Sequence, residues 1–295
     1  MTLPLPPGTR LPDRSVWLNG QLVRGESAAL SLWDRGARMG GAIFETIRVY
    51  AGEPFAWERH LERLVLSAAE LGFPVPPSPA TLRDAVDQVL AAEKLADAVV
   101  RITVTRGVPG GRPVRTGAWV EAETLGSRLW AGTRRRDARP DGGATVIRSQ
   151  WPFSPGWLGR HKTTSRLAWD LPAEEARAAR ADEALLFSPD GHVLEGAASN
   201  VFVVRPDGIV LTPSLDEDVL PGITRDLVMS LCLLIGIEVR ETRIPLDVLE
   251  HAAEVFLTNS VQEVLPVAEL CGRPVASQRV GRRVLAAYRE RVTPG

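Results

Sequence analysis

One lysine stands out as a candidate nucleophile. The chain of 295 residues contains 35 lysines and arginines, and only two of these are lysines, Lys94 and Lys162. An amine can form a Schiff base with an aldehyde or ketone, whereas a guanidinium stays protonated and reacts poorly. Lys94 lies in AAEKLAD, which is typical of a surface cation, while Lys162 lies in GRHKTTSRL between Arg160 and Arg166. Lys162 is therefore a candidate for covalent catalysis, although composition alone fits a retained surface cation equally well.

Two other segments could hold a phosphate group. Residues 220–226, LPGITRD, place Gly222 and Thr224 at the start of an apolar helix, where backbone N–H groups and the helix dipole favour an anion. Asn259 and Ser260 follow the strand-like EVFLT and offer a second set of polar groups. Taken singly, the two patterns also fit an ordinary capped helix and a polar turn.

A carboxylate, Glu195, is expected at the end of a strand in GHVLEGAASNVF. Such a carboxylate could pair with a protonated pyridine nitrogen and keep that ring an electron acceptor. Taken alone, Glu195 also fits a solvated turn residue.

The elements that must position these residues fall into two groups. Asn-Gly between apolar runs predicts a hairpin over 15–23, and Ser78 before Pro79 predicts a helix start. The first group is predicted to hold strands within 15–23, 42–57, 98–107 and 117–125, and helices within 58–73 and 78–97. The second group is predicted to hold a strand at 144–149, hairpins at 183–196, 200–212 and 236–244, and helices near 164–180, 222–236 and 280–292.

These elements predict an α+β fold in two lobes. We expect a small N-terminal α/β domain over 1–133, with a Pro-rich arm over 1–15. A linker over 134–143, RRRDARPDGG, is expected to precede a larger domain over 144–295.

Composition limits the function. A net charge of −1 and 44% hydrophobic residues describe a globular protein that no overall charge draws to nucleic acid or membrane. Two cysteines, Cys232 and Cys271, indicate a reduced, cytoplasmic setting rather than a disulfide scaffold. The alternative of a nucleic-acid contact surface rests on arginines 134–136 near Trp130. No metal site is expected.

Several motifs, in order along nearly the whole chain, resemble the fold-type IV pyridoxal-phosphate enzymes, also called class IV aminotransferases. The motifs are WDRGARMGGAIFETIRVYAG, HLERLVLSAAELG, HKTTSRL, DEALLFSPDGHVLEGAASNVFVV, LTPSLDEDVLPGITR and EVFLTNSVQEVLPV. The resemblance implies pyridoxal 5'-phosphate as cofactor, a larger lobe with a β-barrel-like core, and a homodimer with active sites between the lobes. It also implies that the partner subunit contributes to substrate binding.

The resemblance assigns roles residue by residue. Lys162 matches the Schiff-base lysine, Glu195 the carboxylate on the pyridine nitrogen, and Arg63 the phosphate-binding arginine of the HxxRL motif. Ile223 and Thr224 match the helix start that holds the phosphate. The full set expected at the cofactor is Lys162, Arg63, Glu195, Ser199, Asn200, Leu220, Gly222, Ile223, Thr224, Asn259 and Ser260.

The motifs favour one reaction within the family. Thr46 in FETIRV, the stretch TRGVPGGR, and Arg166 with Leu167 after the lysine resemble aminodeoxychorismate lyase, which releases pyruvate and 4-aminobenzoate for folate synthesis. That lyase is the leading expectation, with Thr46 assisting proton delivery. The alternative is an aminotransferase for branched-chain or D-amino acids. The residues expected at the substrate are Met39, Phe44, Arg101 and Arg112, the last of them binding a carboxylate, and departures such as Gly40-Gly41-Ala42 for the usual GDG leave the substrate open.

Overall fold

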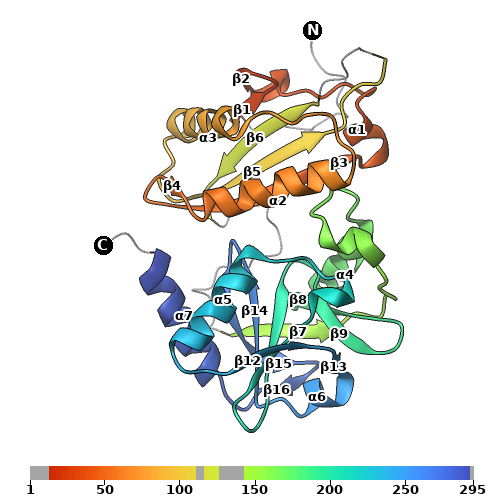
Figure 1. Cartoon of the computed structure of the whole chain (residues 1–295), viewed down its shortest axis with the longest axis vertical. Helices are drawn as coiled ribbons and strands as arrows, with labels where there is room; N and C mark the ends of the chain where they lie inside the picture. The colour runs from red at the N-terminus through yellow and green to blue at the C-terminus, as the bar shows by residue number, and fades with distance from the viewer. Residues whose placement is uncertain (1–12, 111–115, 126–142, 293–295) are drawn as a thin grey trace. The chain divides into compact units, whose positions relative to one another are not determined.

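The chain divides into two units. The computed structural model describes residues 13–110, 116–125 and 143–292 (Figure 1). One unit contains residues 1–125 together with 162–165, and the other contains residues 126–161 and 166–295. The sequence predicts a single boundary between the two lobes. It does not predict that residues 162–165 belong to the first unit. Apart from Gly143, the predicted linker lies outside the described residues, so its bounds stay a prediction.

In its described part, the first unit has a six-stranded sheet in the order β2-β1-β6-β5-β3-β4. The strands are β1 (Ser15–Leu18), β2 (Gln21–Arg24), β3 (Ala42–Tyr50), β4 (Glu53–Pro54), β5 (Ala98–Thr105) and β6 (Ala118–Glu123). The predicted hairpin of β1 and β2 is confirmed, and both Asn19 and Gly20 of its turn have a positive φ. The strands predicted within 42–57 are also confirmed, and β3 pairs with β4.

Two helices cover one face of this sheet (Figure 1). α2 (Trp57–Glu70) packs on β3, and α3 (Pro79–Glu93) packs on β1 and β6. α3 begins where the sequence predicts, because the Ser78 hydroxyl accepts the Thr81 N–H at 3.1 Å and Pro79 takes the first helical position. The shorter α1 (Arg35–Met39) and the 3₁₀ turn η1 (Gly25–Ser27) precede β3.

The strand β3 has different chemistry on its two faces. Side chains alternate along a strand, and Ile43, Ile47 and Val49 belong to the apolar core beneath the helices. Phe44 and Thr46 therefore point to the opposite face of the sheet. Both are buried, with 4% and 7% of their surface exposed.

The second unit contains a larger, mixed sheet. Over its described residues the order is β12-β11-β10-β14-β15-β7-β8-β9-β13, with β16 beside β15. The strands are β7 (Ala144–Arg148), β8 (Glu183–Phe187), β9 (His192–Gly196), β10 (Asn200–Val204), β11 (Val210–Pro213), β12 (Val239–Thr242), β13 (Ile244–Pro245), β14 (Glu254–Asn259), β15 (Glu263–Leu270) and β16 (Arg273–Pro274). The helices are α4 (Leu167–Ala178), α5 (Ile223–Leu234), α6 (Leu246–Glu250) and α7 (Arg279–Val292), with 3₁₀ turns η4 (Gly156–Arg160) and η5 (Leu215–Glu217).

One of three predicted hairpins in this unit is wrong. The hairpins over 183–196 and 200–212 are confirmed by the antiparallel pairs β8–β9 and β10–β11. Residues 236–244 instead form β12, which runs parallel to β11, and β13, which pairs with β9. α5 lies between β11 and β12 in the chain and supplies the crossover that parallel strands need. Alternating residues identify a strand but not its partner.

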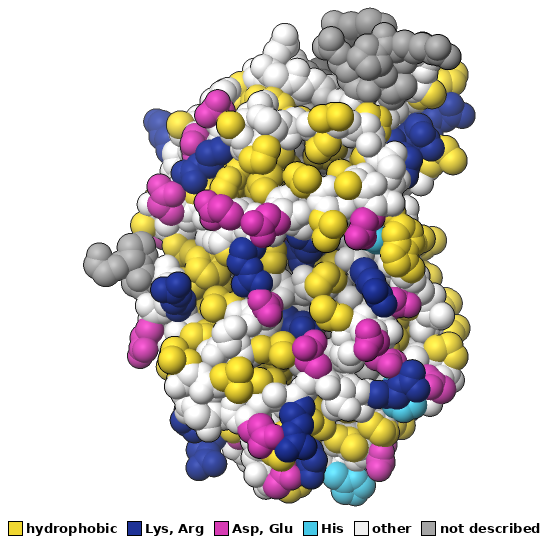
Figure 2. All heavy atoms as spheres, viewed as in Figure 1, with side chains coloured by type: hydrophobic (Ala, Val, Ile, Leu, Met, Phe, Trp, Pro, Cys, Tyr) yellow, Lys and Arg dark blue, Asp and Glu magenta, His cyan; other side chains and the backbone are white. Residues whose placement is uncertain are grey.

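The sheet of the second unit curls around one apolar cluster. Leu211 comes from near one end of the strand order and Ile244 from the other end, yet both belong to this cluster with residues of β7, β8, β10, β14 and β15. This arrangement agrees with the β-barrel-like core that the resemblance implies. None of the helices in the described ranges has the length and apolarity needed to cross a membrane. Acidic and basic side chains are mixed over the face shown in Figure 2.

Candidate active site

Lys162 lies on the outer edge of β3, within the first unit. The Phe44 N–H donates to the Lys162 carbonyl at 2.9 Å, and the Thr164 N–H donates to the Ala42 carbonyl at 2.9 Å. Ile43 and Thr163 form an isolated antiparallel bridge between these two bonds. The backbone of Lys162 is therefore fixed by strand-like pairing, although the residue follows a 3₁₀ turn in the chain.

Two cations lie against one aromatic ring. The Lys162 Nζ lies 4.8 Å from the centroid of the Phe44 ring, and the Arg101 guanidinium carbon lies 3.8 Å from it. Arg101 is opposite Thr46 in the register of β3 and β5, so its side chain points to the same face as Phe44 and Thr46. The structure thus brings together four residues predicted from sequence: a primary amine, a guanidinium, a phenyl ring and a hydroxyl.

On the helix face of β3, a buried carboxylate holds Arg63. The Arg63 Nε and Nη2 donate to the two oxygens of Glu45 at 2.8 and 2.6 Å. The His60 Nδ1 lies 2.7 Å from Glu45 Oε2. Glu45 and His60 are each 1% exposed. Because His60 and Arg63 are three residues apart on α2, both reach the same carboxylate, and the direction of the guanidinium is fixed.

The charges in this group are set by burial and pairing together. Burial alone would raise the pKa of Glu45, but the charge of Arg63 and the hydrogen bond from His60 prevail and lower the pKa to about 2. Burial lowers the pKa of His60, and the nearby carboxylate only partly opposes this. At neutral pH a neutral His60 therefore donates its Nδ1–H to an ionised Glu45.

Glu195 occupies the end of β9 in the second unit, as predicted, and is not a solvated turn residue. It is 4% exposed. The Trp169 Nε1–H of α4 donates to its Oε1 at 2.9 Å, and the Leu220 N–H donates to its Oε2 at 3.1 Å. The carboxylate is thus held from two sides by donors that are far away in sequence.

The start of α5 has the features expected of an anion site. Gly222 is the N-cap and offers no side chain to cap the helix, while Ile223 and Thr224 in the first turn are 7% and 4% exposed. A buried helix start leaves backbone N–H groups that need an acceptor. The Asn200 amide donates to the Leu220 carbonyl at 3.0 Å and fixes the residues just before the helix.

The remaining predicted cofactor residues lie in or directly before turns of the second unit. The Ser199 hydroxyl donates to Glu183 at 2.8 Å, and Glu183 also accepts the N–H groups of residues 197 and 198. The Asn259 Oδ1 accepts the N–H groups of residues 261 and 262, so it organises the turn that contains Ser260. The Asn259 amide also donates to the carbonyl of residue 198 at 3.2 Å, which links the two turns.

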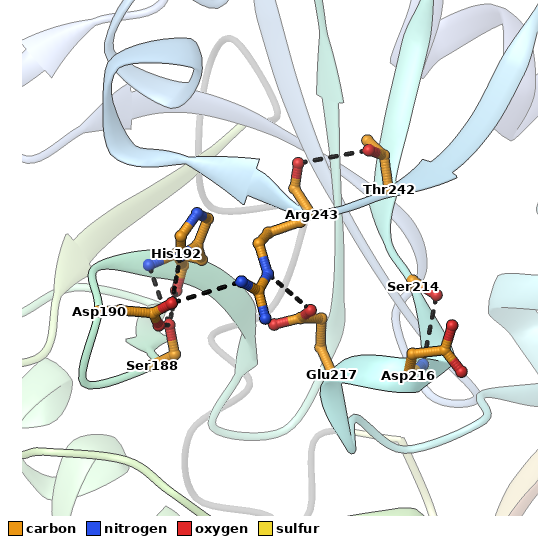
Figure 3. A network of polar contacts seen from close by, with 8 residues as sticks. All are labelled: Ser188, Asp190, His192, Ser214, Asp216, Glu217, Thr242 and Arg243. Atoms are coloured by element: carbon orange, nitrogen blue, oxygen red, sulfur yellow. Dashed lines mark hydrogen bonds and ion pairs between the residues drawn. The ribbon is translucent and has the colours of Figure 1, made fainter.

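Ion pairs hold the segment that leads into α5. The Arg160 Nε donates to Asp218 at 2.7 Å. Arg243 donates to Glu217 at 2.8 Å and lies 3.5 Å from Asp190, so it joins the β8–β9 turn to η5 (Figure 3). The path of residues 214–222 is therefore fixed by contacts from three other parts of the unit.

Two predicted substrate residues are not part of these groups. Met39 ends α1 and is 72% exposed. Arg112 lies outside the described residues. Conversely, three residues of these groups are not predicted from the sequence: Glu45, Trp169 and Glu183. Of these, only Glu45 has a recognisable pattern, since it is two residues from both Ile43 and Ile47 and therefore faces the same side of the sheet as these core residues.

Comparison with known proteins identifies similar sequences and similar folds. A family model described as amino-transferase class IV matches residues 42–270. A branched-chain-amino-acid aminotransferase of Salmonella typhimurium is 29% identical over 282 residues, covering 92% of this chain and 91% of the relative. A D-alanine aminotransferase of Bacillus licheniformis is 30% identical over 267 residues, covering 90% and 92%. The solved structure of the branched-chain amino acid aminotransferase from Escherichia coli matches with a TM-score of 0.83 and 28% identity, covering 95% of this chain and 95% of that chain.

Proposed function

Because the chain belongs to the class IV aminotransferases, which are fold-type IV pyridoxal-phosphate enzymes, we propose that it transfers an amino group from a 2-amino acid to a 2-oxo acid. One observation carries this proposal: the Lys162 amine and the Arg101 guanidinium both lie against the ring of Phe44, a residue of β3. A primary amine can react with an aldehyde cofactor, and a guanidinium can bind a carboxylate through two hydrogen bonds. These are the two groups that an amino-acid substrate on such a cofactor requires.

The residues present fit pyridoxal 5'-phosphate. Its aldehyde reacts with amines, and its protonated ring accepts electrons from the substrate carbon. The start of α5, which no side chain caps, suits its phosphate dianion, and the family resemblance assigns Arg63 to the same phosphate. Glu195 receives N–H donors on both oxygens, which favours the ionised form that a ring nitrogen needs as partner. The roles proposed for Ser199, Asn259 and Ser260 are to shape the turns beside the cofactor.

We propose that Lys162 also moves the substrate's α-proton. With the cofactor and substrate bound, the Lys162 Nζ would be a tethered base that could take up and return this proton. Phe44 limits the directions that this amine can take. Arg101 would hold the substrate carboxylate, and Thr46 on the same face would contribute to the wall of the substrate site.

Amino transfer is a better-supported reaction than the lyase expected first. The relatives described above are named as aminotransferases, for branched-chain amino acids in two cases and for D-alanine in the other. We therefore propose an amino-acid aminotransferase and leave elimination as the outcome that an assay must exclude.

The test supplies L-leucine, D-alanine and aminodeoxychorismate separately to the purified protein, with 2-oxoglutarate as amino acceptor. We expect glutamate and the matching 2-oxo acid from one amino acid, and little 4-aminobenzoate. Rapid release of 4-aminobenzoate and pyruvate without amino transfer would overturn the proposal in favour of the lyase.

A second measurement tests the covalent chemistry. Borohydride reduction followed by peptide mass spectrometry should place the reduced cofactor on Lys162. Lys162→Ala should lose the adduct, and Lys94→Ala is the matched control because Lys94 caps the far end of α3. An adduct on any other residue would contradict the proposed role.

We further propose a homodimer in the cytoplasm. Exposed apolar side chains beside α1 support a subunit contact, since Leu32 and Trp33 are 81% and 66% exposed. Both Cys232 and Cys271 are free thiols, which fits a reducing compartment. Sedimentation equilibrium, repeated with Trp33→Glu, would test the dimer.

A further inference from the structure

The indole of Trp169 is a specific kind of partner for Glu195. The indole nitrogen is a donor only. It can donate a hydrogen bond to a carboxylate oxygen, but it cannot accept one from the hydroxyl of a carboxylic acid. At 2.9 Å, the Trp169 Nε1–H donates to Glu195 Oε1, and the Leu220 N–H donates to the other oxygen. Hydrogen bonds to the charged form stabilise that form.

Trp169 is itself held firmly. Its ring is 9% exposed and meets Phe153 edge-to-face, with 5.1 Å between ring centroids and an interplanar angle of 79°. Phe153 is 1% exposed, and both rings belong to an apolar cluster with Leu194, the neighbour of Glu195 on β9. This packing fixes the orientation of the Trp169 ring, so that its N–H points toward the Glu195 carboxylate.

A cation completes the arrangement. The Arg166 guanidinium carbon lies 5.0 Å from the centroid of the Trp169 ring, and the Arg166 Nη2 donates to the Ala197 carbonyl at 2.6 Å. Its charge is attracted to Glu195, and also to Asp170 and Glu183. Arg166 thus sits between α4 and the turn after Glu195, and its charge favours an ionised Glu195.

We propose that Trp169 is a positioning residue that keeps Glu195 ionised and fixed in direction, as the partner of a protonated heterocyclic nitrogen. This inference rests on the proposed function, because the nitrogen belongs to the pyridoxal phosphate ring. When the indole N–H is lost, Glu195 becomes more basic, and the proton shared with the ring nitrogen moves toward the carboxylate.

The test uses Trp169→Phe, which keeps an aromatic ring and removes the N–H. Trp151→Phe is the matched control, because Trp151 is 43% exposed and belongs to the same unit. The first readout is the titration of the Glu195 carboxyl, followed by carbon NMR in the full chain without added cofactor. A hydrogen bond to a charged group contributes about tenfold, so we expect the Glu195 midpoint to rise by about one pH unit in Trp169→Phe and to stay unchanged in Trp151→Phe.

The second readout uses pyridoxal phosphate labelled with ¹⁵N in the ring. In Trp169→Phe we expect about tenfold weaker cofactor binding and a ¹⁵N resonance displaced toward the neutral-pyridine value. A purely structural role would lower the melting temperature without moving either NMR signal. Glu195 titrating as in wild type, or a displaced Glu195 midpoint with unchanged cofactor binding and ¹⁵N resonance, would overturn the inference.

If Trp169→Phe does not fold, a titration of the wild-type protein tests the inference instead. The Trp169 indole proton resonance should shift with the same midpoint as the Glu195 carboxyl, and an indole resonance indifferent to that titration would overturn the inference. Failure of the proposed function has different results: 4-aminobenzoate release without amino transfer if the reaction is elimination, or no binding of pyridoxal phosphate to wild-type protein if the cofactor is wrong. The carboxyl titration does not depend on either outcome.

Discussion

The pairing of Glu45 with Arg63 and His60 predicts a measurable loss of stability in acid. The pKa of Glu45 falls from its ordinary value of 4.5 to about 2 in the folded protein. A carboxyl whose pKa is lowered by folding contributes stability above its unfolded pKa and loses it as the pH falls toward the folded pKa. The difference of about 2.5 units corresponds to about 3 kcal/mol, of which about 1.4 kcal/mol is lost between pH 7 and pH 3.5.

Glu45→Gln removes this titration while keeping the shape of the side chain. At pH 7 the variant should be less stable by about 3 kcal/mol or more, because Arg63 then lacks a counter-charge in a buried place. The difference in free energy of unfolding between wild type and variant should be smaller by about 1.4 kcal/mol at pH 3.5 than at pH 7. Urea denaturation at both pH values measures this difference in free energy of unfolding. Both proteins carry His60→Gln, because Glu45 also opposes the lowering of the His60 pKa and would otherwise add a second titration to the difference.

Glu53→Gln is the matched control in the same unit. The Glu53 side chain is 74% exposed and lies 3.1 Å from Arg83, so its loss should change stability by no more than about 1 kcal/mol. A gap between wild type and Glu45→Gln that is equal at pH 7 and pH 3.5 would refute the reasoning. The Glu45 carboxyl would then not be an ionised partner of Arg63.

Two further predictions concern the second unit. In Gly222→Ala, the new Cβ would overlap with the Asn200 Oδ1, which should cost about 1–3 kcal/mol of stability and weaken phosphate binding. Thermal unfolding measures the cost of Gly222→Ala in wild type and again in Asn200→Ala. An equal cost in the two backgrounds would argue against the overlap. Burial raises the pKa of both thiols, that of Cys232 to about 11, but only Cys271 is exposed. Native protein should therefore react with one equivalent of a thiol reagent, and with a second only after unfolding. Fast reaction at both cysteines would contradict the burial of Cys232.

The sequence could predict elements whose causes are local. Asn19-Gly20 forms the turn between β1 and β2 because both residues accept a positive φ, and Ser78 with Pro79 starts α3 through neighbouring atoms. The strand end at Glu195 and the helix start at Thr224 are also predicted, because local patterns mark both. Lys162 is identified by its chemistry, and its pairing with β3 is not predicted.

Contacts between distant segments could not be predicted in this way. The alternation in 236–244 predicts a strand, but its parallel pairing with β11 depends on how α5 crosses the sheet. The contact of Trp169 with Glu195 joins residues 26 apart through the packing of α4. Periodicity assigns a side chain to a face, and only the tertiary fold determines which partner it meets there.

Because residues 162–165 pair with β3, the first unit is built from two separate segments of the sequence. A fragment that stops at residue 125 would leave the backbone groups of Ala42 and Phe44 without the partners that Thr164 and Lys162 provide. Proteolytic nicking between residues 125 and 162 should accordingly leave two polypeptides that copurify. Swapping this unit between homologous enzymes would require transplanting the four-residue segment as well.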